Sequence, residues 1–249
     1  LPNDLKEAAA LLEGRGSLTR IIGGGTALFA LMKERLFFPE SLVDLQGISD
    51  LKFLLMEEEE LRIGAMTTLT DIERSPVTLN NVPFLAEVVG RVASRRLRNQ
   101  ITLGGCLAYG ETASDPPAAC LVLDARVRAA RKGHSRVIAI KDLFVDLYET
   151  SLQQNEVITE VIVPKIGPNT IFGHYKFTPR SKADKPTLGI AVRLDLSPKD
   201  KMCLDARVAF SNASLVPMRS LAAEGILRGQ PMGGDLFQQA AEVAAEEVD

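Results

Sequence analysis

The sequence predicts an α+β protein of two domains, divided near residue 164. Over residues 1–164, short apolar runs with strand-like and helix-like spacing alternate. Pro164, Gly167 and Pro168 then interrupt the pattern, and three long β-like runs and two helical segments follow. We therefore expect one domain over residues 1–164 and a smaller α+β domain, an antiparallel sheet with helices, over residues 165–249.

The first domain begins with a helix, a strand and a second helix. In "DLKEAAALLEG" (4–14), Asp4 is placed to cap a helix, Glu7 stands at the capping-box position and Gly14 marks the end. "TRIIG" (19–23) is typical of a buried strand, and "TALFALMKERL" (26–36) has the apolar spacing of a helix.

Further strands and one helix are predicted along the rest of the first domain. We expect strands at 42–45, 51–56 and 61–65, a helix at 82–94, and a hairpin whose strands span 124–130 and 135–140. The acids from Glu57 to Glu60 favour a solvated hairpin tip over a metal site, because adjacent side chains on a turn diverge.

The second domain is predicted to be an antiparallel meander followed by helices. Its three β-like runs lie at 172–180, 187–197 and 202–214, and its helical segments lie at 218–229 and 235–248. Because a helix begins almost at residue 1 and another runs to the last residue, we expect both ends to be clipped relative to the natural product.

Composition excludes several classes of protein. A chain of 249 residues that is 46% hydrophobic can bury a proper core. The net charge of -3, from 29 Lys and Arg against 32 Asp and Glu, argues against partners such as nucleic acid or an anionic membrane. No apolar run reaches the roughly 18 residues that span a bilayer, and no leader pattern is present, so we expect a cytoplasmic protein without membrane insertion.

The cysteines and histidines predict no metal site. Cys106, Cys120 and Cys203 lie far apart, so they assemble neither a zinc site nor an iron–sulfur cluster. His134 and His174 have no acidic or cysteine neighbour at ligand spacing, and we assign neither a catalytic role.

Three consecutive glycines stand between the strand and the helix of residues 19–36. In "IIGGGTALFALMK" (21–33), a bare backbone at a helix start would expose amide groups to an anion such as a phosphate. The segment matches neither G-x-G-x-x-G, because Leu28 takes the third glycine position, nor a Walker A loop, which needs a lysine. A tight turn packed under a helix explains the glycines equally well.

A second glycine stretch favours the anion site. In "RNQITLGGCLAYGETASDPP" (98–117), Gly104 and Gly105 follow a short apolar segment, and Asp115 comes soon after in a stretch without a helical pattern. Two such turns could cradle a diphosphate from opposite sides, and a carboxylate could accept a hydrogen bond from a ribitol hydroxyl or a ring N–H. The ligand could be a dinucleotide.

Eight stretches in order resemble one known family. They are "IIGGGTALFALMK", "LVDLQGISDL", "RIGAMTTLTDIERS", "RNQITLGGCLA", "SDPPAACLVLDA", "EVITEVIVP", "YKFTPR" and "RSLAAEGILRG". In this order the sequence is similar to the FAD-binding medium subunit of molybdenum hydroxylases, the family of carbon monoxide dehydrogenase and xanthine dehydrogenase. The resemblance covers nearly the whole chain.

The resemblance implies a fold and a set of FAD contacts. The family fold is a PCMH-type FAD-binding domain of two subdomains, followed by a smaller C-terminal domain. The two glycine segments would hold the FAD diphosphate, Asp115 would contact the cofactor further along, and Ile158 and Lys176 would approach the flavin. The residues so implied are Ile21, Ile22, Gly23, Gly24, Gly25, Thr26, Ala27, Leu28, Thr102, Leu103, Gly104, Gly105, Cys106, Asp115, Ile158 and Lys176.

Two positions depart from the family pattern. The family usually has Asn where this chain has Cys106, and often Asp, Ser or Glu where it has Ala27, so two side-chain hydrogen bonds to the cofactor would be missing. Cys106 could also be a reactive thiol, although a small residue tolerated in a tight loop is the plainer interpretation. Between Gly105 and Asp115 the chain lacks the cysteine-bearing insertion of the 4-hydroxybenzoyl-CoA branch.

The resemblance also implies a function. The chain would be the FAD-carrying electron-transfer subunit of a molybdenum-containing dehydrogenase, an oxidoreductase. Its partners would be a large molybdopterin-cofactor subunit and a small subunit with [2Fe-2S] clusters, assembled as a dimer of heterotrimers. Two alternatives remain open, namely a self-contained flavin reductase or oxidase, and a non-catalytic assembly factor of the same fold.

Two groups of cations admit both a functional and a structural interpretation. Lys176 could steady a negatively charged reduced flavin, although a lysine in an alternating strand usually faces solvent. Arg95, Arg96 and Arg98 precede the second glycine stretch, and a solvated helix end is the favoured interpretation.

Overall fold

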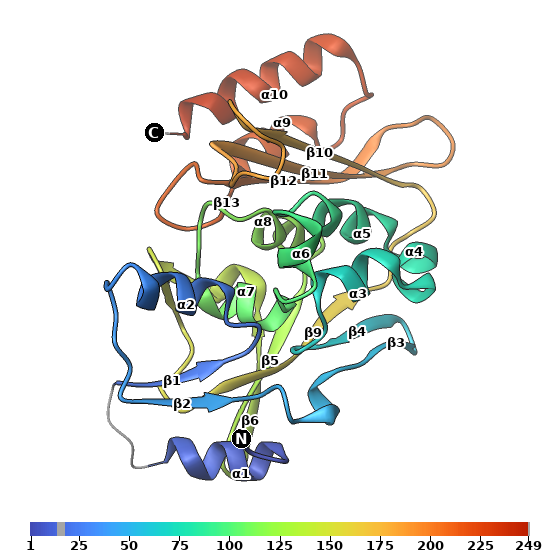
Figure 1. The fold of residues 1–249 in the computed structure, drawn as a ribbon. Coiled ribbons are helices and arrows are strands. Elements are labelled where there is room, and N and C mark those ends of the chain that lie inside the picture. The colour runs from blue at the N-terminus through green and yellow to red at the C-terminus, as the bar shows by residue number, and fades with distance from the viewer. Residues whose placement is uncertain (14–17, 249) are drawn as a thin grey trace.

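The computed structural model describes residues 1–13 and 18–248. The chain builds three packed parts, each with its own cluster of buried apolar side chains. In Figure 1 the N-terminal part lies at the bottom left, a larger sheet with its helices lies in the middle, and a C-terminal sheet with two helices lies at the top. The predicted α+β fold is confirmed; the division at residue 164 stays a prediction.

The N-terminal part is a helix, a parallel strand pair and a second helix. α1 (Leu5–Leu12) is capped by the Asp4 side chain, as predicted; the predicted stop at Gly14 lies outside the described residues. β1 (Thr19–Ile22) pairs in parallel with β2 (Ser41–Asp44), and α2 (Thr26–Lys33) connects them. α1 packs on this pair through Ala8 and Leu12.

The middle part is an antiparallel sheet of strand order β3-β4-β9-β5-β6. Helices cover this sheet and separate it from the C-terminal part (Figure 1). Its strands are β3 (Leu54–Glu57), β4 (Glu60–Gly64), β5 (Arg126–Arg131), β6 (His134–Ala139) and β9 (Val157–Pro164). Its helices are α3 (Leu69–Arg74), α4 (Pro76–Asn81), α5 (Pro83–Gly90), α6 (Arg95–Arg98), α7 (Leu103–Tyr109) and α8 (Asp115–Val122). The short elements are the 3-10 turns Ser49–Leu51 and Ile140–Asp142 and the pair β7 (Phe144–Asp146) and β8 (Glu149–Thr150).

Both predicted hairpins of the middle part are present. β5 and β6 turn at Gly133, whose φ of 69° suits glycine. β3 and β4 turn at Glu58 and Glu59. The acids at this tip are not simply solvated, because Glu57 pairs with Arg62, and Glu60 pairs with Arg126.

The C-terminal part is the predicted meander with helices on one face. β10 (Thr170–Phe177), β11 (Leu188–Leu196) and β12 (Cys203–Ser211) are antiparallel neighbours, and β13 (Met218–Arg219) adds a short edge. α9 (Leu221–Leu227) and α10 (Gly234–Glu246) cover one face. α5 and α8 of the middle part pack against the other (Figure 1).

Three local predictions were wrong. Asp115 was expected outside a helix, yet it opens α8 with Pro116 and Pro117. Proline has no backbone N–H, and this costs nothing in the first helical turn, because an N–H there would have no acceptor within the helix. The second glycine stretch was expected as a loop, yet it is the first turn of α7. Arg98 was expected in a solvated helix end, yet its guanidinium is mostly buried against Glu73 and the carbonyls of Val92 and Ala93.

Within residues 1–13 and 18–248, no helix has the length and apolar character to cross a membrane.

Candidate functional site: two glycine segments and a buried Asp–Lys pair

The first glycine segment ends β1 and starts α2 with open amide groups. Gly25 is the N-cap residue and adopts a left-handed conformation with φ 73°, and no side chain caps the helix. In the described part of the chain, the amides from Gly24 to Leu28 donate to no protein acceptor. Open amides at the start of a helix attract anions, because the helix dipole adds a partial positive charge. The geometry therefore fits one phosphate-bearing group at α2.

The two glycine segments pack directly on each other. A Cβ at Gly24 would overlap the carbonyl oxygen of Gln100, and a Cβ at Gly23 would stand 2.9 Å from the Thr102 hydroxyl. A Cβ at Gly105 would stand 2.7 Å from the same hydroxyl. The tight-turn and the anion-site interpretations of the glycines are therefore compatible. Bare backbone is needed for the close packing, and it also leaves the amides of the first segment without acceptors.

The second segment differs from the first because its amides already have acceptors. Thr102 caps α7, and its side chain accepts from Gly105 N while its carbonyl accepts from Cys106 N. The amides of Leu103 and Gly104 donate to the carbonyls of Thr67 and Ala65, at 3.1 and 3.0 Å. The second segment therefore braces the first, and the open donors all come from the α2 side.

Cys106 connects the second glycine segment to α8. Its Sγ lies 3.3 Å from the Ser114 hydroxyl, and Ser114 is the N-cap residue of α8. Burial raises the pKa of the Cys106 thiol to about 11, so the thiol stays protonated at neutral pH. This geometry favours the plainer interpretation of a small packed residue over a reactive cysteine.

Asp115, the next residue, forms a buried ion pair with Lys176. Asp115 Oδ2 lies 2.8 Å from Lys176 Nζ, and the two side chains are 1% and 7% exposed. Lys176 also donates to the carbonyl of Arg91 at 3.1 Å. The structure therefore excludes the solvent-facing alternative for Lys176, and the two residues implied to contact FAD lie against each other where α8 meets β10.

His174 belongs to the same group, which the sequence did not predict. Its Nε2 lies 3.5 Å from Asp115 Oδ1, and its side chain is 1% exposed. The statement that His174 has no acidic neighbour was true along the chain but is wrong in the fold. The available signal was the two-residue spacing of His174 and Lys176, which places both on one face of a strand.

Known proteins place this arrangement in a family. A family model described as the FAD binding domain in molybdopterin dehydrogenase matches residues 1–166, which is more than half of the chain. A second model, the C-terminal domain of carbon monoxide dehydrogenase flavoprotein, matches residues 173–249. The chain belongs to this family of molybdenum hydroxylase flavoproteins.

Individual relatives agree in both sequence and structure. The carbon monoxide dehydrogenase medium chain of Hydrogenophaga pseudoflava is 31% identical over 98% of this chain and 84% of its own length. The nicotine 6-hydroxylase medium subunit of Paenarthrobacter nicotinovorans is 32% identical over 99% and 85%. A solved carbon monoxide dehydrogenase from H. pseudoflava matches with a TM-score of 0.96 at 31% identity, over 100% of this chain and 85% of that one. The recognised resemblance is thereby confirmed, and the chain is a medium-subunit flavoprotein of a molybdenum-containing oxidoreductase.

The other residues that the resemblance assigns to FAD binding differ in how exposed their side chains are. Ile22 and Leu103 are buried and can offer a ligand only their backbone. Ile21, Thr26, Ala27 and Leu28 are partly exposed around the start of α2. Ile158 lies in β9 with 4% exposure, opposite Ala129, and α7 packs on this strand. The structure brings the two glycine segments and Asp115 into one chain of contacts through Cys106 and Ser114.

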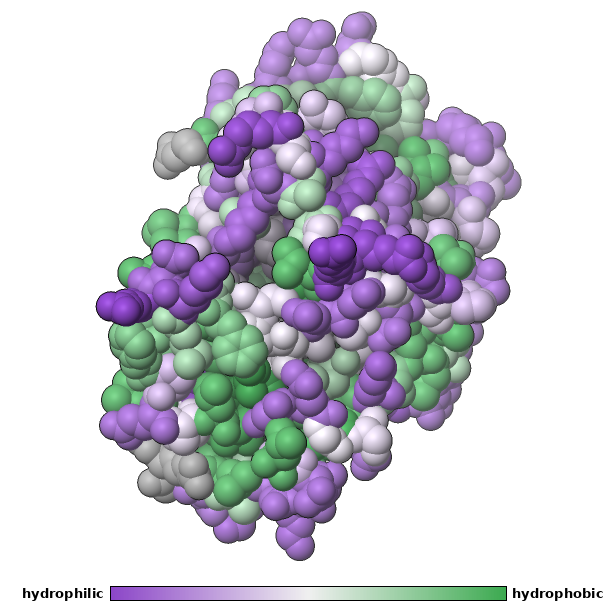
Figure 2. All heavy atoms as spheres, in the orientation of Figure 1, coloured by the Kyte–Doolittle hydropathy of each residue, from purple (hydrophilic) through white to green (hydrophobic). Residues whose placement is uncertain are grey.

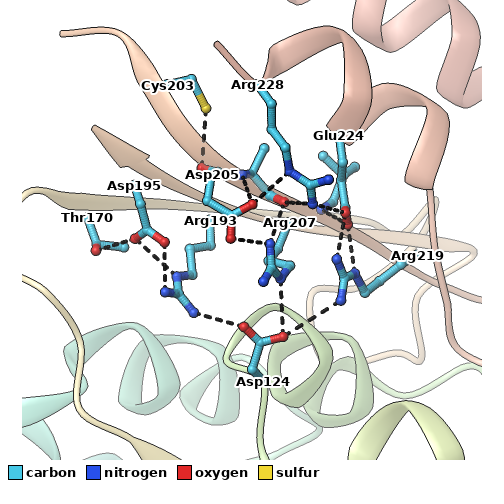
Figure 3. Close-up of polar contacts among 12 residues, drawn as sticks. Asp124, Thr170, Arg193, Asp195, Cys203, Asp205, Arg207, Arg219, Glu224 and Arg228 are labelled. Carbon is cyan, nitrogen blue, oxygen red and sulfur yellow. Dashed lines mark hydrogen bonds and ion pairs between the residues drawn. The ribbon is translucent and has the colours of Figure 1, made fainter. Parts of the chain in front are cut away.

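A network of charges fixes the C-terminal part of this flavoprotein on the middle part (Figure 3). The carboxylate of Asp124, just after α8, pairs with the guanidinium groups of three sheet residues, Arg193, Arg207 and Arg219. These arginines also bind three acids of the C-terminal part, Asp195, Asp205 and Glu224 respectively. No local sequence pattern predicts this network, because Asp124 lies far along the chain from its three arginines.

Apolar side chains are exposed beside the first glycine segment. Figure 2 shows them gathered at the lower left, over α2 and the β1–β2 pair. Phe29, Leu36 and Phe38 are 52%, 73% and 64% exposed, and α2 has no fully buried residue. Such exposure is typical of a surface that another protein chain covers.

Proposed function

We propose that this chain binds FAD with its diphosphate at the start of α2. The observation that supports this most directly is the row of amides from Gly24 to Leu28 without protein acceptors, beside the bracing segment from Thr102 to Cys106. Asp115, Ile158 and Lys176 complete the proposed cofactor-binding set, together with the residues of the two glycine segments, which run from Ile21 to Leu28 and from Thr102 to Cys106. The same proposal assigns the chain no catalytic acid, base or metal ligand.

The proposed role is electron transfer. FAD accepts electrons singly and releases them in pairs, which suits the exit point of an electron chain. This chain contributes position and charge: the α2 amides hold the anionic end, and Lys176 keeps a buried ammonium group at the junction of α8 and β10. Its partner Asp115 keeps that ammonium group in one place.

The partners follow from the medium-subunit character of the relatives. We propose that the chain assembles with a large molybdopterin-cofactor subunit and a small [2Fe-2S] subunit as a dimer of heterotrimers in the cytoplasm. Electrons would arrive from the iron–sulfur clusters and leave to an external acceptor. The substrate would then be selected on the large subunit.

Co-expression with the two partner subunits tests this role. A tagged chain should copurify with both, and the complex should carry FAD. The complex is then mixed separately with carbon monoxide, an aldehyde, a purine and an N-heterocycle. We expect the absorbance of the oxidised flavin to fall with the compound that is the substrate. A complex whose iron–sulfur clusters become reduced while its flavin stays oxidised would contradict the electron-transfer role.

A further inference from the structure

His174 occupies a position that the proposed function leaves unused. It lies in β10, between Phe172 and Lys176 on the strand face that packs against the middle part. The ring of Phe172 stacks on Phe84 of α5, with centroids 4.5 Å apart. His174 is therefore held between the two domains, and not on the outer face of the edge strand.

The imidazole has a partner within reach but no hydrogen bond. Its Nε2 lies 3.5 Å from Asp115 Oδ1, whereas Asp115 Oδ2 pairs with Lys176 at 2.8 Å. Within the described residues, both ring nitrogens of His174 and Asp115 Oδ1 are buried without a hydrogen-bond partner. Asp115 is thus held from one side only, by the lysine.

A third unpaired group lies beside the same carboxylate. Gly189 of β11 stands opposite Lys176 of β10 and opposite Ser211 of β12. A Cβ at Gly189 would overlap Ser211 Oγ and would come within 3.5 Å of Asp115 Oδ1, so the bare backbone keeps this space open. Ser211 Oγ is also buried and unpaired. The unpaired Ser211 hydroxyl and the unpaired His174 ring therefore both lie near the free oxygen of Asp115.

Unpaired buried polar atoms cost stability, and an apolar ring would fill the place of His174 without that cost. A nitrogen donor next to Asp115 Oδ1 can orient the Asp115 carboxylate. It can hold the carboxylate in a single orientation, so that the Lys176 ammonium group meets only Oδ2. Without the donor, the carboxylate can rotate and take the ammonium group between both oxygens, which neutralises more of its charge.

We propose that His174 is a positioning residue of the FAD site: a small turn of its ring closes the 3.5 Å separation and lets Nε2 donate to Asp115 Oδ1. This inference rests on the proposed function, because the consequence is a Lys176 charge that stays available to the cofactor. An available cation favours the negatively charged reduced flavin and so raises its midpoint potential. His174 would act through Asp115 and would not itself touch the flavin.

Substitution at the two histidines tests the proposal. His174→Phe removes the donor and keeps a ring, His174→Gln restores an N–H donor, and His134→Phe makes the same change at the exposed start of β6. We expect His174→Phe to leave the thermal midpoint unchanged or higher, to raise the FAD dissociation constant about tenfold and to lower the flavin midpoint potential. His174→Gln should recover most of both flavin properties, and His134→Phe should change neither.

Three outcomes would contradict the proposed role of His174 or the function on which it rests. If His174→Phe binds FAD as tightly and at the same potential as the wild type, or if His174→Gln is as impaired as His174→Phe, the positioning role is wrong. If His174→Phe does not fold, His174→Leu replaces it with a smaller apolar side chain and the same expectations. A wild-type protein that binds no FAD would instead overturn the proposed function, and this inference with it.

Discussion

Lys176 Nζ lies 2.8 Å from Asp115 Oδ2, and this pair joins the first residue of α8 to the edge strand of the C-terminal sheet. Both side chains are almost completely buried. A buried charge needs its partner, because water no longer compensates it. The pair therefore links the packing of the two domains to the proposed cofactor site.

Removal of Lys176 should destabilise the whole protein. Lys176→Met leaves the Asp115 carboxylate buried and unpaired, so we expect the free energy of unfolding to fall by about 3–5 kcal/mol. The double variant with Asp115→Asn should recover part of that loss. Urea unfolding of both variants measures this coupling, and a Lys176→Met protein as stable as the wild type would show that the pair is not buried in solution.

Gly24→Ala should disrupt the first glycine segment. Its Cβ would overlap the Gln100 carbonyl oxygen, so the backbone must move and the α2 amides move with it. We expect a loss of about 1–3 kcal/mol in stability and a loss of bound FAD. Gly173→Ala is the matched control, because a Cβ there meets nothing within 4 Å. Equal FAD content in both variants would argue against a phosphate site at α2.

Asp124→Asn should weaken the docking of the C-terminal sheet. The carboxylate pairs with Arg193, Arg207 and Arg219, and a neutral amide would leave three guanidinium groups close together. We expect a loss of about 1–3 kcal/mol in the free energy of unfolding. Glu13→Gln, at the exposed pair with Lys132, should cost about 0–1 kcal/mol. Equal losses in denaturant unfolding would mean that the network adds no more than a surface pair.

Cys106 should resist alkylation in the folded protein. With a pKa of about 11, roughly one thiol in a thousand is ionised at pH 8. Burial also raises the pKa of Cys120, to about 12, so neither should react with iodoacetamide until the protein unfolds. Mass spectrometry locates the alkylated cysteines with and without urea. Rapid modification of Cys106 without urea would restore the reactive-thiol interpretation.

Cys106→Asn should tighten FAD binding. The family resemblance places an Asn here, and one hydrogen bond to a charged group is worth about 1.5–3 kcal/mol. The FAD dissociation constant should therefore fall about tenfold or more. Titration of the apoprotein with FAD measures it. An unchanged constant would mean that the backbone amides supply the binding without a side chain at this position.

Stability should fall in acid partly through Glu156. Burial raises the pKa of this carboxyl, but hydrogen bonds from Arg136 and the Gln153 amide lower it more, so it lies below 4.5. A pKa lowered in the folded state stabilises the protein above pH 4.5 and loses that contribution as the pH falls through the folded value. Glu156→Gln should therefore be less stable at pH 7 and lose less on acidification. Unfolding free energies from pH 7 to pH 3 test this; parallel curves for the two proteins would contradict it.

The features that were predicted correctly from the sequence are those that depend on residues close together along the chain. Alternation and glycine placement located the β5–β6 hairpin and the C-terminal meander, and the eight motifs identified the family. The start of α8 was missed because Pro116 and Pro117 interrupt the helical pattern after Asp115, although a first helical turn accepts proline. The Asp124 network and the His174–Asp115 contact were missed for another reason, since no local pattern records which distant side chains meet.

If the chain holds FAD, denaturing the purified protein should release it. Mass spectrometry identifies the released compound and relates its amount to the protein. We predict FAD at close to one molecule per chain. A protein that remains empty even when FAD is supplied would contradict the proposed site and would leave the fold without its electron carrier.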